Sequence, residues 1–172
     1  MNIDSNRKLR SIDIIFFIIF FFSFICLIIS CFFYYNWLKQ SCLLVLGWII
    51  LFLGFIPAIM ASTRFKKEGG VLEGDSCLKT NLVVNKGIYR IVRNPMYLSP
   101  IVFTIGLISI SQHWITLLLA IPVIFYFYYY MIIEEKMNIN KFGAGYINYM
   151  KQTPRLNILY GLLKFLLNKK NK

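Results

Sequence analysis

Four long runs of apolar residues limit what this chain can fold into more than any other feature. They cover residues 12–35, 41–61, 95–111 and 114–133, and Asp13 is the charged residue within them. At about 1.5 Å per residue, a helix over most of these runs crosses a hydrocarbon core of about 30 Å, and the third is near the lower limit. We therefore expect an all-α, polytopic integral membrane protein in which four transmembrane helices form a single domain over residues 1–172.

The composition favours the same environment. Hydrophobic residues make up 58% of the chain and charged residues 15%, whereas about a quarter of a soluble domain is charged. The net charge of +12 does not indicate a nucleic-acid partner, because the apolar runs separate the basic residues and leave no continuous patch. The four cysteines form no CxxC pair, so we expect no metal site.

The first run has an alternative interpretation as a cleaved signal peptide. Arg7, Lys8 and Arg10 precede it and resemble the basic start of such a peptide. The run is longer than the apolar part of a signal peptide, however, and no small-residue cleavage site follows it. A membrane anchor is therefore the favoured interpretation.

The distribution of basic residues predicts the orientation. Three lie before the first run, seven in segment 62–94 and eight in tail 134–172, whereas the two short links carry one and none. With four spans, the three basic segments fall on one side, which is the positive-inside pattern with both termini cytoplasmic. Within the tail, residues 156–167 are too short to span and predict an interfacial amphipathic helix, whose basic end at Lys169 to Lys172 would lie among anionic headgroups.

The last two runs form a helical hairpin, because only residues 111–113 separate them. Asn94 is a good N-cap and Pro95 suits the first helical position, so the third helix is expected to begin there. Antiparallel packing brings Arg93 to the same membrane level as Glu134 and Glu135, which we place at the C-terminal end of the fourth helix.

Two interpretations of this end of the hairpin stay open. One is a structural Arg–Glu pair that closes the hairpin. The other is a pocket for a zwitterionic or cationic ligand, formed by an anion site, a carboxylate pair and tyrosines. Many of the tyrosines could instead belong to an aromatic belt. The tail from Phe142 to Arg155, broken by Gly143 and turned by Pro154, is either a cap over such a pocket or a plain connector.

Several motifs occur together in this half of the chain. They are Gly87-x-Tyr89-x-x-x-Arg93-Asn94-Pro95-x-Tyr97, Gly106, Glu134-Glu135, Phe142-Gly143, Tyr146, Tyr149 and Pro154-Arg155. In order and spacing, this set resembles the superfamily of isoprenylcysteine carboxyl methyltransferases and phospholipid methyltransferases, over residues 82 to about 155.

The resemblance implies an integral-membrane methyltransferase that uses S-adenosyl-L-methionine and a lipid or lipid-like acceptor within the membrane. It implies that Glu134 engages the charged amino-acid moiety of the cofactor and that Arg93 holds the anionic part or braces the pocket. By position, the cofactor-binding residues would be Tyr89, Ile91, Val92, Asn94, Tyr97 and Glu134. The catalytic set would be Arg93, Glu134 and Glu135, and the substrate-facing residues Tyr130 and Arg155.

Two positions depart from the family pattern. Asn94 stands where the family often has histidine, and an asparagine cannot carry a proton at neutral pH. Tyr130 stands where prenylcysteine carboxyl methyltransferases have an arginine that is thought to face the substrate carboxylate. Methylation of a prenylcysteine is therefore less favoured, and a lipid amine, a hydroxyl or another hydrophobic acceptor stays open.

Two other functions compete with a methyltransferase. A sterol-reductase-like enzyme that uses a nicotinamide cofactor shares an Arg-His-Pro-x-Tyr type of motif, but it usually has a longer chain. A non-catalytic four-span scaffold is the second alternative, since a fold does not guarantee an activity. The sequence leaves the oligomeric state open.

Overall fold

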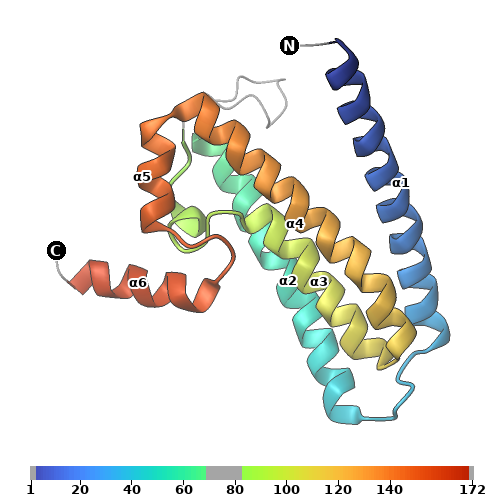
Figure 1. Cartoon of the computed structure of the whole chain (residues 1–172). Helices are drawn as coiled ribbons and strands as arrows, with labels where there is room; N and C mark the ends of the chain where they lie inside the picture. Colours follow the sequence, from blue (N-terminus) through green and yellow to red (C-terminus); the bar gives the residue numbers. More distant parts are fainter. Residues whose placement is uncertain (1–2, 69–82, 171–172) are drawn as a thin grey trace. The chain divides into compact units, whose positions relative to one another are not determined.

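The computed structural model describes the backbone of residues 3–68 and 83–170 and the side chains within 12–64 and 83–167. Within these residues the chain contains helices and no strand, which confirms the all-α expectation (Figure 1). The order is α1 (Ile3–Phe33), α2 (Ser41–Glu68), the short 3-10 helix η1 (Gly87–Arg90), α3 (Pro95–Ser111), α4 (Trp114–Phe142), α5 (Ala144–Gln152) and α6 (Ile158–Lys170).

Some sequence-based predictions fall outside the described residues. They concern residues 69–82 of the expected cytoplasmic segment, together with Cys77, and the basic side chains of Arg7, Lys8, Arg10 and Lys169 to Lys172.

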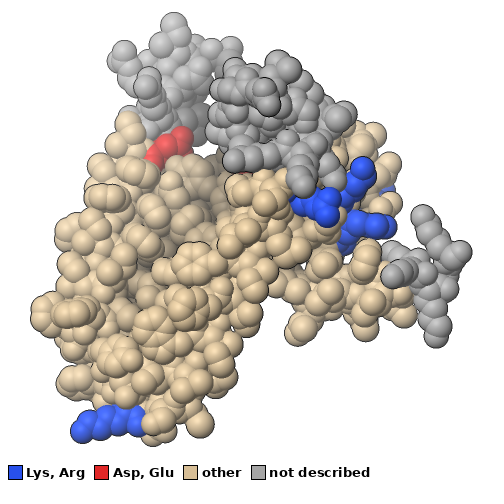
Figure 2. Space-filling view, turned by 180° about the vertical axis from the view of Figure 1, so that it is seen from behind, with Lys and Arg blue, Asp and Glu red and all other residues tan. Residues whose placement is uncertain are grey.

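Among the residues that the structure describes, three helical stretches are long and apolar enough to cross a membrane, namely Ile12–Phe33, Ser41–Arg64 and Trp114–Phe142. The length and the composition of these helices are those of an integral membrane protein. The third expected span, α3, is a shorter apolar helix of 17 residues, so the count of four spans stays a prediction. Figure 2 shows a face on which uncharged residues cover most of the described surface, as expected for a protein surrounded by lipid.

The C-terminal end of α4 differs from the sequence-based boundary. Helix α4 does not stop at residue 133 but continues to Phe142, where Gly143 with a φ of 55° ends it. Glu134 and Glu135 are therefore inside α4, and the expectation that they lie at its C-terminal end is wrong. Residues 134–142 contain no glycine or proline that would terminate a helix. The helix therefore continues past the end of the apolar run, although these residues are more polar.

Contacts divide the chain into two compact units. The first unit comprises residues Met1–Leu53 and Ile101–Tyr130, and the second comprises Gly54–Pro100 and Met131–Lys172. Helices α2, α3 and α4 contribute residues to both units. Whether residues 1–172 act as one membrane domain stays a prediction.

The first unit is held together by close helix packing. Leu27 of α1 packs with Ala120 and Val123 of α4 in a fully buried apolar cluster. Gly106 of α3 lies so close to α2 that an added Cβ would be 2.8 Å from the backbone nitrogen of Leu51. Small residues that allow such approach are typical of helix contacts in membranes.

The hairpin link of the first unit is confirmed, because α3 ends at Ser111 and α4 begins at Trp114. The side chain of Gln112 binds the backbone of Gln40, accepting from its nitrogen at 3.1 Å and donating to its oxygen at 2.9 Å. His113 stacks on Tyr34 with ring centroids 3.8 Å apart. These contacts fix the link between α1 and α2 on the hairpin tip and explain the histidine without a catalytic role.

Candidate functional site

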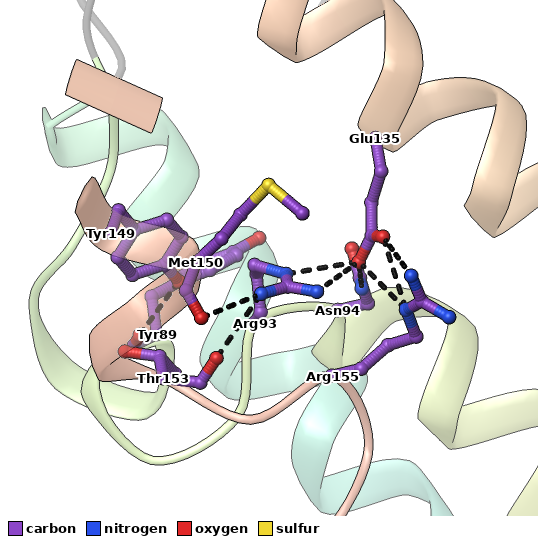
Figure 3. A network of polar contacts seen from close by, with 8 residues as sticks. All are labelled: Tyr89, Arg93, Asn94, Glu135, Tyr149, Met150, Thr153 and Arg155. Carbon is purple, nitrogen blue, oxygen red and sulfur yellow. Dashed lines mark hydrogen bonds and ion pairs between the residues drawn. The ribbon is translucent and has the colours of Figure 1, made fainter. Parts of the chain in front are cut away.

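A buried ion cluster in the second unit is centred on Glu135 of α4 (Figure 3). Arg93 binds its Oε1 through Nε and Nη2, both at 2.9 Å. Arg155 binds its Oε2 through Nε at 3.0 Å and Nη2 at 2.8 Å. The amide of Asn94 also donates to Oε1 at 2.6 Å. Glu135 is 3% exposed, so these contacts balance a charge that water barely reaches.

Arg93 also connects the cluster to the tail. Its Nη1 donates to the backbone oxygens of Met150 at 3.1 Å and Thr153 at 3.2 Å. Its backbone nitrogen donates to the oxygen of Pro154 at 2.9 Å. The guanidinium thus connects α4 with the end of α5 and the turn that follows it. The tail from Phe142 to Arg155 therefore folds back onto the ion cluster.

Asn94 occupies the expected N-cap position, since its carbonyl oxygen accepts from the nitrogen of Leu98 at 3.1 Å. Its side chain, however, donates to Glu135 rather than capping the helix. An asparagine amide supplies this donor at every pH, which a neutral histidine does only in one tautomer.

Glu134 has different surroundings from its neighbour. Its Oε2 accepts from the hydroxyl of Tyr97 at 2.6 Å, and the residue is only partly buried. Glu134 lines a cavity, and Glu135 does not. The adjacent carboxylates therefore differ in position: one faces a cavity, and the other lies inside an ion cluster.

The cavity lies within the second unit and has a volume of about 450 Å³. This size is within the usual range for small-molecule sites, which is about 300–1,000 Å³. Its lining combines acidic, basic, amide, aromatic and aliphatic side chains: Val83, Val84, Tyr89, Arg93, Asn94, Pro95, Met96, Tyr97, Glu134, Met137, Asn138, Lys141, Phe142, Tyr146 and Tyr149.

Four of the residues that line this cavity are tyrosines, at positions 89, 97, 146 and 149. The hydroxyl of Tyr149 donates to the backbone oxygen of Tyr89 at 2.7 Å, and the Tyr146 ring lies 5.8 Å from that of Tyr149. Burial raises the pKa of Tyr149 above its ordinary range and also raises the pKa of Tyr146. Both hydroxyls therefore stay protonated at neutral pH, and Tyr149 remains a donor.

The structure brings most of the predicted cofactor-binding residues to the cavity, which Tyr89, Asn94, Tyr97 and Glu134 line. Arg93, from the predicted catalytic set, lines it as well. The predicted proximity of the two ends of the hairpin is confirmed by the Arg93–Glu135 and Tyr97–Glu134 contacts.

The remaining predicted site residues lie elsewhere. Ile91 and Val92 do not line the cavity; Val92 is fully buried, and the backbone oxygen of Ile91 faces Gly161 of α6. Arg155 binds Glu135, as described above. Tyr130 belongs to the first unit, where its hydroxyl donates to Asp13 at 3.4 Å.

Three lining residues on α4 were not predicted from the sequence, namely Met137, Asn138 and Lys141. They follow Glu134 by three, four and seven positions, which is the spacing of one helix face. This signal was present in the sequence, but it becomes informative only once the helix is extended beyond residue 133.

Comparison with known protein families gives a match. A family model described as Phospholipid methyltransferase matches residues 42–145, which is more than half of the chain and includes α3, α4 and most of the cavity. Searches of curated proteins and of solved structures returned no match.

Proposed function

The chain belongs to the phospholipid methyltransferase family, and from this premise we propose that it transfers a methyl group from S-adenosylmethionine to a lipid-like acceptor at the cytoplasmic membrane interface. Membership supports a membrane methyltransferase and a lipid substrate. The donor, its binding residues and the side of the membrane belong to the proposal. The observation that carries it is the cavity of about 450 Å³, with a carboxylate and an ammonium group in one lining.

The lining suits the donor because S-adenosylmethionine carries a sulfonium, an ammonium and a carboxylate. In the proposal, Glu134 binds the ammonium while Tyr97 orients the carboxylate of Glu134 through their 2.6 Å hydrogen bond. Aromatic side chains such as Tyr89 and Tyr146 offer electron-rich faces to the cationic parts of the donor.

In the proposal, Lys141 binds the donor carboxylate, because its side chain lines the same cavity as Glu134. Arg93 also lines the cavity, and its guanidinium binds Glu135 and two backbone oxygens. Lys141 has its Nζ 5.2 Å from the ring centre of Phe142, at the end of α4 beside the cavity. Arg93 and Glu135 thus act as positioning residues in this proposal.

When bound, S-adenosylmethionine supplies a methyl group that is already activated on a sulfonium. The chain therefore needs no nucleophile of its own and contributes by orientation and by exclusion of water. The buried Glu135 cluster holds the N-terminal end of α3 and the turn after α5 in place. Glu134 and Tyr97 then fix the donor for an in-line attack by the acceptor.

Binding of S-adenosylhomocysteine to the purified protein in detergent tests the donor site. Isothermal titration calorimetry should show saturable binding, and Glu134→Gln should weaken it by about 1–3 kcal/mol, because a shielded charged hydrogen bond is lost. Lys136→Gln is the matched control, since Lys136 is an exposed neighbour that does not line the cavity. Equal affinities for Glu134→Gln and the parent protein would remove Glu134 from the site.

The same titration separates the competing functions. Saturable binding of NADPH in place of S-adenosylhomocysteine would indicate a reductase, and binding of neither would indicate a scaffold. Radiolabelled methyl transfer into a total lipid extract, compared with prenylcysteine analogues, identifies the acceptor class. In that assay, Tyr130→Arg should gain activity on a prenylated acid if position 130 faces the substrate, and no gain would remove that role.

A further inference from the structure

Helix α6 carries a row of exposed leucines on one face. Leucines 159, 162, 163 and 166 follow the spacing of one helix face, and their exposed fractions run from 38% to 81%. Asn157 caps the start of the helix, because its Oδ1 accepts from the nitrogen of Tyr160 at 3.0 Å. The helix is thus a defined element with an exposed leucine row.

The opposite face of α6 is seated on the second unit. A Cβ added to Gly161 would lie 1.8 Å from the backbone oxygen of Ile91, so this glycine allows direct contact. The guanidinium of Arg90 lies over the ring of Phe165, with its Cζ 5.1 Å from the ring centre. Lys164 donates to the backbone oxygen of Lys151 at 2.9 Å. The leucine row therefore points away from the protein.

The charge around α6 is basic. Lys86, Arg90 and Lys151 are exposed in the second unit, and Figure 2 shows lysine and arginine side chains gathered next to the arm formed by α6. Among the side chains described in this unit, the acidic ones are Glu134 and Glu135, and both have partners within the site. An exposed apolar row beside basic groups is the pattern of a helix that lies in an anionic lipid surface.

Helix α6 is also coupled to the ion cluster. Only two residues separate it from Arg155, which binds Glu135. The nitrogens of Arg93 and Asn94 donate to the backbone oxygens of Pro154 and Arg155 at 2.9 and 3.2 Å. Any displacement of α6 therefore acts on the segment that contributes Arg93 and Asn94 to the cavity.

We propose that the leucine row of α6 docks on an anionic lipid surface and thereby holds Arg93, Asn94 and Arg155 in the arrangement that binds the methyl donor. The docking of the leucine row depends on α6 alone, whereas its coupling to donor binding rests on the proposed function. The lipid surface is thus a partner of the enzyme as well as the source of its acceptor.

Docking is measured on the full-length protein in lipid nanodiscs. Leu163→Trp adds a tryptophan on the leucine row, and Ile147→Trp adds one at a comparably exposed apolar position of α5. In nanodiscs of equal parts phosphatidylcholine and phosphatidylglycerol, the added emission at position 163 should shift to the blue and be quenched by a fixed fraction of phosphatidylcholine with brominated acyl chains. In pure phosphatidylcholine with the same fraction of brominated lipid both effects should be weaker, and position 147 should show neither. Equal quenching at the two positions would overturn the docking.

Coupling is measured as the affinity for S-adenosylhomocysteine in the same two kinds of nanodisc. The parent protein should bind severalfold more tightly when phosphatidylglycerol is present. A variant with both Leu163→Ser and Leu166→Ser should lose this difference, and Ile147→Ser should keep it. Gly161→Val should lose it as well, because a side chain at 161 separates α6 from Ile91 while the leucine row stays intact.

The outcomes separate the two proposals. If position 163 is quenched but the affinity for S-adenosylhomocysteine is the same with and without phosphatidylglycerol, the coupling is overturned and the docking stands. Absence of any S-adenosylhomocysteine binding by the parent protein would overturn the proposed donor site and the coupling with it, while the fluorescence result still decides the docking.

Discussion

The two units of this protein are stabilised in opposite ways. In the first unit, helices meet through small and apolar residues, and the side chains of Ser30 and Thr116 form a buried hydrogen bond of 2.7 Å between two helices. In the second unit, Glu135 forms ion pairs with two arginines and accepts a hydrogen bond from an asparagine. Close packing suffices to assemble membrane helices, whereas a fixed cavity needs groups with defined directions. The buried charged side chains that the structure describes, Arg93 and Glu135, both belong to the second unit.

The largest expected effect comes from breaking the ion cluster. Glu135→Ala leaves Arg93 buried without its carboxylate partner and should destabilise the second unit by about 3–5 kcal/mol. Unfolding in detergent, followed by circular dichroism against temperature and denaturant, measures this loss. Lys136→Ala, one position along α4 and exposed, should leave unfolding unchanged. Equal stabilities of the two variants would contradict the role of the cluster.

A smaller loss is expected from overpacking the first unit. Gly106→Ala places a Cβ 2.8 Å from the backbone nitrogen of Leu51, and since backbone must move, the cost should be about 1–3 kcal/mol. Gly145→Ala is the control, because no atom lies within 4 Å of its added Cβ. The same unfolding assay should show the Gly145 variant at least as stable as the parent protein, and a loss as large as that of Gly106→Ala would refute the packing argument.

Tyr149→Phe should cost about 0.5–1.5 kcal/mol, because it removes the buried hydrogen bond to Tyr89. It also has a pH signature. The pKa of Tyr149 is raised in the folded protein, so its contribution is complete below the unfolded pKa of about 10 and is lost as the pH rises above that value. The stability of the parent protein should therefore fall more steeply than that of Tyr149→Phe in alkaline solution. Parallel curves would exclude Tyr149 as the group responsible.

The smallest effect is expected for the polar pair of the first unit. Ser30→Ala should cost about 0.6 kcal/mol, the average for hydrogen bonds between membrane helices. Combining it with Thr116→Val should cost less than the sum of the single changes, because both partners of one bond are then absent. A double-mutant cycle of unfolding free energies measures the coupling, and strict additivity would show that the pair contributes nothing.

The sequence was most informative where a single local rule governs the outcome. The limits of α3 followed from Pro95 at its start and from the short link at residues 111–113. The meeting of Arg93 with the acidic pair followed from the antiparallel hairpin, since a tight turn places both ends at one level.

The division of labour between Glu134 and Glu135 could not be predicted. Adjacent residues on a helix point about 100° apart, and which of them faces a cavity depends on tertiary packing. Likewise, no local sequence feature predicts the ion pair between Arg155 and Glu135, because that contact depends on how α5 and the turn after it fold back. The C-terminal end of α4 was missed because the end of an apolar run was taken as the end of a helix, although no helix-breaking residue occurs before Gly143.

The central claim is that the cavity of the second unit holds the methyl donor. Ultraviolet crosslinking of radiolabelled S-adenosylmethionine to the purified protein, followed by peptide mapping, tests it most directly. The account predicts saturable label in peptides that contain residues 83–97 or 134–149, displaced by excess S-adenosylhomocysteine. Label confined to α1 or to the first half of α2, or label that excess competitor leaves in place, would contradict it.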